Sequence, residues 1–142
     1  MFASVLVAEE ATDRLQREMI ADERVQPLMR AVGRVHVVEE ARHGRFARDE
    51  LARLVPTLSR RALERERWLT ALVSTEVVNS LWQARLYRAV GLSGREGRRA
   101  ALANPAHAGT KQFMVAKVLD FLRGVGMVGG RSEVVWRRAG LV

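Results

Sequence analysis

The sequence His36-Val37-Val38-Glu39-Glu40-Ala41-Arg42-His43 lies in the middle of a long predicted helix. At about 3.6 residues per turn, His36, Glu40 and His43 project from one face of that helix. Apolar residues continue this face in both directions: Val25, Met29 and Val32 before it, and Ala47, Leu51 and Leu54 after it. Imidazole and carboxylate groups inside an apolar stripe need polar partners, because leaving a buried carboxylate unpaired is costly. The spacing therefore predicts that these three residues bind a metal ion.

A competing interpretation treats His36 and His43 as core histidines bonded to the backbone, and pairs Glu40 with an arginine. The coincidence of three such groups on one stripe favours the metal. Glu40 and His43 also form a Glu-x-x-His pair. In carboxylate-bridged di-iron bundles, one helix uses this spacing to present a bridging carboxylate and an imidazole to the bundle core.

The run over residues 25–43, followed by Phe46-Ala47-Arg48, resembles the p-aminobenzoate N-oxygenase (AurF-like) di-iron oxygenases. Their helix carries a Glu-x-x-His pair with an extra histidine four residues before the glutamate. The resemblance covers residues 5–54 and is faint beyond Pro56. It implies a ferritin-like bundle that binds two Fe ions, takes O₂ as co-substrate and electrons from a donor, and oxidises a small aromatic amine. Glu40 would be the bridging carboxylate.

A further carboxylate ligand is predicted on the preceding helix, residues 2–21. Glu9 projects from inside the apolar arc of this helix, and the resemblance places a family glutamate at the same distance before His36. Glu10 falls on the polar side, where an i, i+4 pair with Arg14 accounts for it. The predicted metal ligands are thus Glu9, His36, Glu40 and His43. The alternative for Glu9 is a glutamate at the core edge, paired with an arginine.

The whole chain is predicted to form a single all-α domain, residues 1–142. Its ligand helices would span about 2–55, with Pro27 opening the second and Pro56 ending it. A packing helix would follow over about 58–90, with its segment 68–87 deeply packed, and short helices would fill about 95–139. His107, after the Asn104-Pro105 turn, is expected to face solvent.

Only one Glu-x-x-His pair occurs in the sequence, and the residue three positions after Glu76 is Asn79. A complete site of this type needs two such pairs. We therefore expect an incomplete ferritin-like bundle, the C-terminal half, in a truncated product, a fragment, or one half of a split or dimeric site. The expected partner is a second copy of the chain or a complementary N-terminal half.

Composition excludes some function classes. The chain has no cysteine, so it forms neither disulfides nor thiolate metal sites. Its net charge is +8, but all except two of its 24 basic residues are arginines scattered among acidic residues, so no nucleic-acid partner is predicted. No apolar run reaches the roughly 20 residues that span a bilayer. Membrane association is therefore not predicted either. A cytoplasmic location is expected.

Two other functions remain open at this point. One is a small basic all-α regulator or interaction module without catalytic metal. The other is a degenerate family member that keeps the half-bundle for assembly only. The interaction module leaves the stripe of His36, Glu40 and His43 as a coincidence. Iron content separates both functions from the oxygenase.

Overall fold

Helices make up nearly all of the computed structural model, which describes residues 2–142, and that part of the chain contains no strand. The all-α prediction is therefore confirmed. The elements in order are α1 (Phe2–Ala21), α2 (Pro27–Leu54), the 3₁₀ turn η1 (Val55–Thr57), α3 (Arg60–Ser80), α4 (Ala84–Ala89), α5 (Gly94–Ala103), α6 (Pro105–Gly124), the 3₁₀ turn η2 (Gly130–Ser132) and α7 (Glu133–Arg138).

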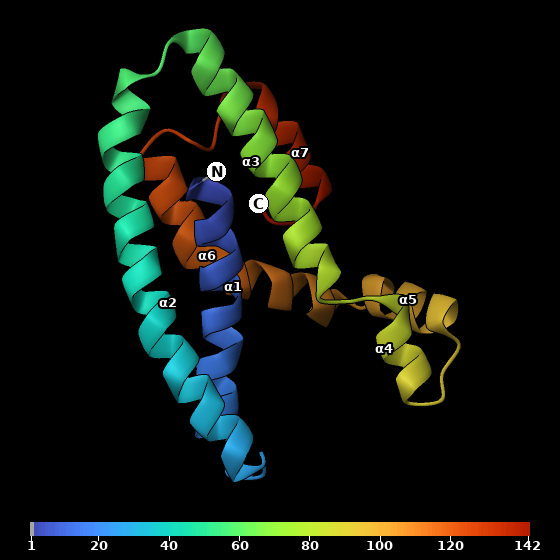
Figure 1. Cartoon of the computed structure of the whole chain (residues 1–142). Coiled ribbons are helices and arrows are strands. Elements are labelled where there is room, and N and C mark those ends of the chain that lie inside the picture. The colour runs from blue at the N-terminus through green and yellow to red at the C-terminus, as the bar shows by residue number, and fades with distance from the viewer. Residues whose placement is uncertain (1) are drawn as a thin grey trace.

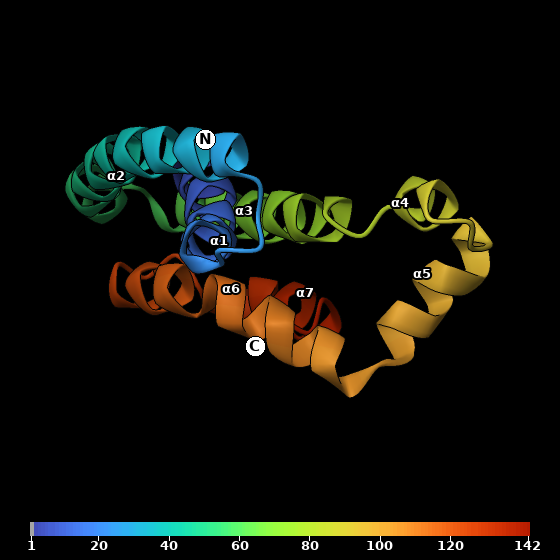
Figure 2. The same ribbon diagram turned by 90° about the horizontal axis from the view of Figure 1, so that it is seen from below.

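Helix α1 lies at the centre of the fold and packs against α2, α3 and α6 (Figure 1). Figure 2 shows α6 and α7 as a second layer beneath α1, α2 and α3. The core is built where the two layers meet. Its fully buried members include Leu6 and Val7 of α1, Ala71 and Val78 of α3, Met114, Val115, Val118 and Leu122 of α6, and Trp136 of α7.

Local sequence signals explain most helix boundaries. The Ser59 hydroxyl accepts a hydrogen bond from the Ala62 N–H at 3.3 Å and so caps α3. Asn104 caps α6 by accepting from the Ala106 N–H at 2.9 Å. A proline opens both α2 and α6, where its missing N–H costs nothing.

Gly33 of α2 lies where α1 and α2 pack closely. A Cβ at this position would lie 2.9 Å from Met19 Cε and 3.1 Å from Ile20 Cγ1, both in α1. The missing side chain lets the two helices approach closely, and α1 and α2 run antiparallel along most of their length (Figure 1). This pairing brings the predicted ligand positions of the two helices to the same level.

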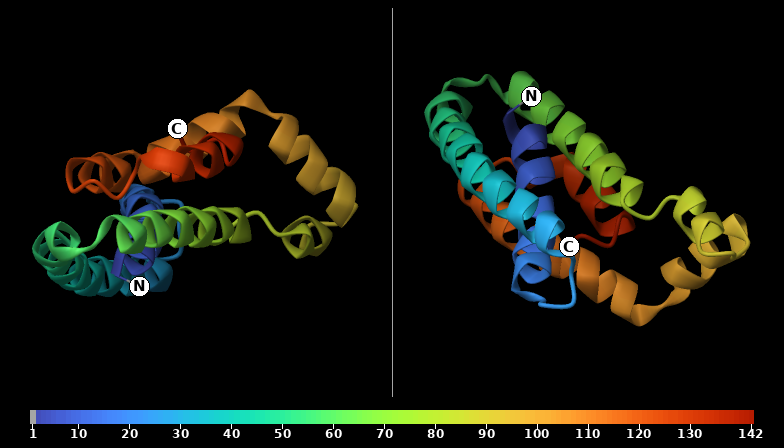
Figure 3. Two further views of the ribbon diagram at one scale, coloured as in Figure 1. Left: turned by 90° about the horizontal axis from the view of Figure 1, so that it is seen from above. Right: turned by 60° about the horizontal axis from the view of Figure 1, so that its bottom comes forward.

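The predicted packing helix over residues 58–90 is wrong beyond Ser80. Helix α3 ends at Ser80, and α4 is a separate helix. The Leu81 and Trp82 N–H groups bond to carbonyls only three residues back, and the Trp82 ring packs edge-on against His107 with centroids 4.6 Å apart. Because this contact with α6 holds the chain at Trp82, the helix direction changes there. Both views in Figure 3 show α4 and α5 extending to one side of the other helices.

The expected deep packing of segment 68–87 is also wrong. Trp68, Leu69, Leu72 and Val73 are each 42–46% exposed. Helix α3 packs against α1, η2 and α7, and it buries its opposite side, with Ala71 and Val78. The apolar outer side of α3 is therefore open in the described chain.

No helix among residues 2–142 has the length and apolar character needed to cross a bilayer.

His107 is buried, contrary to the expectation that it faces solvent. Helix α6 begins at Pro105, directly after Asn104, which places His107 in its first turn and against Trp82. Only 8% of the residue is exposed, and Nε2 has no hydrogen-bond partner in the described structure. Burial, assisted by the charge of Lys111, lowers the pKa of His107. The folded state thus disfavours the protonated imidazole.

This burial predicts an acid-sensitive fold. Since the folded-state pKa lies below the unfolded value of about 6.5, the unfolded chain takes up the proton first, and stability is lost as pH falls below that value. His107→Phe keeps a ring against Trp82 but cannot titrate. We expect urea unfolding of this variant to depend less on pH between about 7 and 5 than that of the wild type. Equal pH dependence of the two proteins would contradict the assignment.

Candidate metal centre

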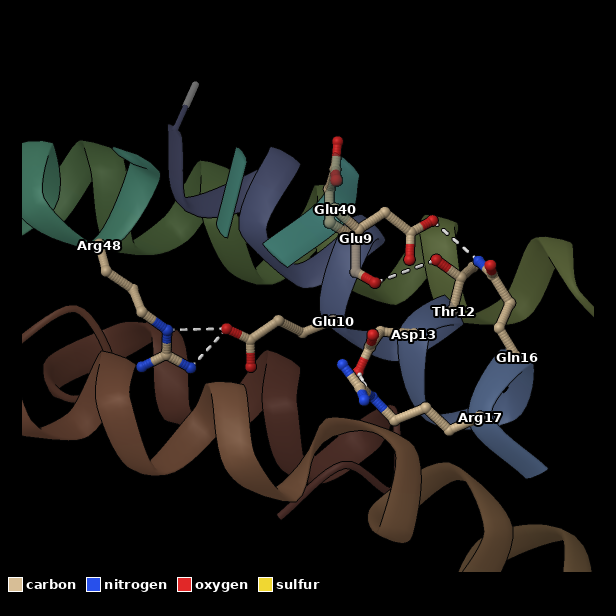
Figure 4. Close-up of polar contacts among 8 residues, drawn as sticks. All are labelled: Glu9, Glu10, Thr12, Asp13, Gln16, Arg17, Glu40 and Arg48. Carbon is tan, nitrogen blue, oxygen red and sulfur yellow. Dashed lines mark hydrogen bonds and ion pairs between the residues drawn. The ribbon is translucent and has the colours of Figure 1, made fainter. Parts of the chain in front are cut away.

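The antiparallel pairing of α1 and α2 brings Glu9 and His43 together. Glu9 Oε1 lies 3.4 Å from His43 Nδ1, across the seam between the two helices. Further along the seam, Gln16 Nε2 donates a hydrogen bond of 2.8 Å to Glu40 Oε1. Gln16 lies two turns after Glu9 and therefore on the same face of α1. The two predicted carboxylate ligands thus occupy one seam (Figure 4).

Glu40 sits in an unfavourable environment for a carboxylate. Burial is the main cause that raises its pKa, and the nearby carboxylates of Glu9 and Asp13 raise it further. The hydrogen bond from Gln16 and the charge of His36 act in the opposite direction. One oxygen of Glu9 and one of Glu40 are also buried without a hydrogen-bond partner among residues 2–142. A cation between these carboxylates would relieve both problems.

The two histidines lie on a more open side of α2. His36 is exposed one turn before Glu40, and the His43 side chain is 64% exposed. Within residues 2–142, no three His, Asp or Glu side chains converge closely enough to enclose a metal ion. The donor set of two carboxylates and two imidazoles fits iron chemically, and the unpartnered carboxylate oxygens fit a bound cation. The assignment of Glu9, His36, Glu40 and His43 as ligands stays a prediction.

Glu10 has a different partner from the one expected. It forms an ion pair with Arg48 of α2 instead of Arg14 (Figure 4). Arg14 instead donates a hydrogen bond of 2.6 Å to the Phe113 carbonyl, with its guanidinium 3.5 Å from the centroid of the Phe113 ring. The face of α1 that carries Glu10 and Arg14 is thus covered by other helices rather than by solvent. Glu10 points away from the group formed by Glu9 and Glu40.

Sequence reasoning missed Gln16 and Arg48 as neighbours of the candidate centre. Gln16 could have been found from its helical spacing with Glu9. Arg48 could not, because its partner lies 38 residues earlier in the chain. A pocket of about 270 Å³ opens beside the seam, and its lining is charged rather than apolar as in typical small-molecule sites. The charged residues of that lining are Glu9, Glu10, Asp13, Arg17, Glu40, Arg45, Arg48, Asp49 and Lys117.

Two further acidic residues do not join this centre. Glu76 is exposed on α3 and has no ion pair within the described chain. Asp120 is an exposed helix-face charge and pairs with Arg123 at 3.2 Å. The candidate centre is therefore confined to α1 and α2.

Comparison with known proteins gives a family match over most of the chain. The model of the family described as P-aminobenzoate N-oxygenase AurF matches residues 1–126. This is well beyond residues 5–54, where the sequence resemblance is strongest. The family has a ferritin-like helical fold, which agrees with the predicted fold class.

Curated relatives match a shorter stretch. Uncharacterised proteins of Mycobacterium tuberculosis and Mycobacterium bovis are each 38% identical to this chain over 60 residues. The match covers 42% of this chain and 18% of each relative, so the chain spans only a small part of their length. No solved structure matches.

Proposed function

This chain belongs to the AurF family of p-aminobenzoate N-oxygenases, and we propose that its helices α1 and α2 supply ligands to a di-iron centre of the arylamine N-oxygenase type. The observation that carries this proposal is the seam between the two helices. There Glu9 lies beside His43, and buried oxygens of Glu9 and Glu40 lack hydrogen-bond partners within the described residues.

The proposed role of each residue follows from its chemistry. Glu9 and Glu40 would provide anionic oxygens, with Glu40 as the bridging carboxylate, and His36 and His43 would provide neutral imidazole nitrogens. Gln16 orients Glu40 through its hydrogen bond and leaves the other Glu40 oxygen free for the metal. Since burial raises the pKa of Glu40, metal binding would favour release of its proton.

The iron pair, when bound, would supply the O₂ chemistry that oxidises the amino group of a small aromatic amine, with electrons from a donor. The protein's contribution is to position the ligands between α1 and α2. The charged pocket beside the seam lacks the apolar lining that would suit an aromatic ring.

The proposal is tested by anaerobic Fe(II) loading of the full chain and of its Glu9→Ala and Glu10→Ala variants, followed by desalting and iron determination. Glu9→Ala should weaken iron binding by a factor of about ten to a hundred or more, the range known for losses around a metal site. Glu10→Ala should leave the iron in place. It should lower the free energy of unfolding by about 1–3 kcal/mol, because Arg48 loses its carboxylate partner.

If Glu10→Ala lost its iron and Glu9→Ala retained it, Glu9 would not be a metal ligand. Loaded wild-type protein is then mixed with p-aminobenzoate, O₂ and a chemical reductant, and formation of the hydroxylamine or nitro product is measured. A wild-type chain that retains no iron would contradict the proposal.

The second candidate is a basic interaction module without catalytic metal. It is favoured by the segment formed by α4 and α5, which extends to one side of the other helices (Figure 3). Residues 84–103 carry five arginines against one glutamate, together with exposed apolar side chains. These apolar side chains are Leu86, Val90, Leu92 and Leu102. The iron measurement separates this function from the oxygenase.

A further inference from the structure

A groove outside the candidate metal centre runs along helix α3. Its other walls come from α5, α6 and α7, and α3 and α7 lie side by side (Figure 1). The cavity has a volume of about 460 Å³, and its α3 residues are Trp68, Leu72, Thr75 and Asn79. These positions share one helix face and, at a rise of about 1.5 Å per residue, extend for about 16 Å. We call this cavity the α3 groove.

One end of the α3 groove is apolar. The Arg131 N–H donates a hydrogen bond of 3.4 Å to Glu64, and this contact places the start of α7 beside the first turns of α3. Trp68 and Leu72 therefore lie near Val134 of α7 at this end of the groove. These three apolar side chains are each 42–43% exposed, so a ligand in the groove can contact them.

The other end of the groove is cationic. Lys111 Nζ donates a hydrogen bond of 2.7 Å to the Ala139 carbonyl, which places the first half of α6 beside the end of α7. The ring contact between α6 and the end of α3 holds the same part of α6 there. Lys111 and Arg138 therefore line this end, and α5 adds Arg98. The lining of the groove contains no aspartate or glutamate of the described chain.

Lys111 differs from the two arginines because it is buried. Only 8% of the residue is exposed, and burial lowers its pKa. Its ammonium group has more N–H donors than the single one that the Ala139 carbonyl accepts, and no carboxylate among residues 2–142 pairs with it. Burying a charge is costly unless an opposite charge accompanies it. An anion in the groove would therefore stabilise the charged form of this lysine.

We propose that the α3 groove binds a medium-chain fatty acid. The carboxylate would lie among Lys111, Arg98 and Arg138, and the hydrocarbon chain would extend along α3 over Leu72 towards Trp68. A groove about 16 Å long fits an extended chain better than a single aromatic ring, and its two ends match a ligand with one anionic and one apolar end. This inference goes beyond the proposed function and does not depend on the iron centre, because no residue of α1 or α2 lines the groove.

Calorimetric titration of the full chain with hexanoate, octanoate and decanoate tests the ligand class, with each acid kept below the concentration at which it forms micelles. Affinity should rise about fourfold with each added methylene until the groove is filled, because each methylene buries apolar surface. Decylamine, which carries a positive head, should bind at least about tenfold more weakly than decanoate. Decylamine binding as tightly as decanoate, or p-aminobenzoate binding more tightly, would overturn the inference.

Lys111→Gln tests the contact with the carboxylate, and Lys117→Gln is its matched control. Both variants lose one positive charge from α6, but Lys117 is exposed and does not line the groove. Lys111→Gln should weaken decanoate binding at least about tenfold, whereas Lys117→Gln should match the wild type.

Circular dichroism checks that Lys111→Gln folds. Arg138→Gln changes an exposed position, so it should fold in any case, and it should weaken decanoate binding by about twofold to fivefold. Wild-type affinity in Arg138→Gln and in folded Lys111→Gln would overturn the placement of the carboxylate.

Leu72→Glu tests the contact with the hydrocarbon chain, and Val73→Glu is its control. Both residues are 42% exposed on α3, so both variants should fold, but only Leu72 lines the groove. Leu72→Glu should weaken decanoate binding at least about tenfold, because its carboxylate would lie against the chain and repel the head. Val73→Glu should match the wild type. Equal affinities of the two variants for decanoate would overturn the proposed site.

Discussion

Replacing Glu40 with alanine is expected to abolish iron retention. Changes in groups that only orient metal ligands cost about ten- to a hundredfold in affinity, so loss of a bridging ligand should cost more than about a hundredfold. Glu40→Gln should have nearly the same effect, because the amide keeps the shape but removes the negative charge. Iron per chain after desalting, together with Fe(II) affinity by competition with a chelator, measures both variants.

Glu39→Ala is the matched control for this prediction. Glu39 is the adjacent carboxylate on the same helix, but it is exposed and does not lie in the seam with α1. In protein saturated with Fe(II), this variant should retain iron. If Glu39→Ala and Glu40→Ala lost iron equally, the effect would come from general negative charge on α2 rather than from ligation. The proposed ligand set would then be wrong.

Replacing Trp136 with alanine is expected to give the largest loss of stability in this chain. Trp136 is fully buried in α7 and joins the hydrophobic core, so its removal leaves a cavity that the surrounding helices fill only in part. Such substitutions typically cost about 3–5 kcal/mol. That is a large fraction of the roughly 5–15 kcal/mol that stabilises an ordinary domain. Urea unfolding followed by circular dichroism measures the loss.

Trp68 provides the control, because it is the same residue type in a different environment. It is 42% exposed on α3, and its removal leaves no closed cavity. We expect Trp68→Ala to cost clearly less than Trp136→Ala, because less apolar surface is lost and no cavity remains. Equal losses for the two variants would mean that α7 does not pack as described. The slope of the unfolding free energy against urea concentration should be the same for both variants and the wild type. Equal slopes would show that the stabilities can be compared directly.

The sequence by itself determined the helices that carry the candidate centre. Residues 2–21 and 27–55 were predicted as helices, and α1 and α2 match these bounds to within one residue. These limits depend on local features, such as Pro27 at the helix start and Pro56 after its end. Periodicity also shows which side chains share a face, because the rotation per residue is the same in every α-helix. The stripe of His36, Glu40 and His43 follows from that geometry alone.

Only the tertiary structure decided which groups become partners. Glu10 pairs with Arg48 rather than Arg14, and α3 ends early where Trp82 meets His107 of α6. Spacing along the sequence predicts which residues can contact each other within one helix. The packing of several helices determines which of their faces are covered. The same reason explains the burial of His107 and the exposure of Leu72. Each depends on contacts between residues far apart in the chain, whose energies are not encoded in any single segment.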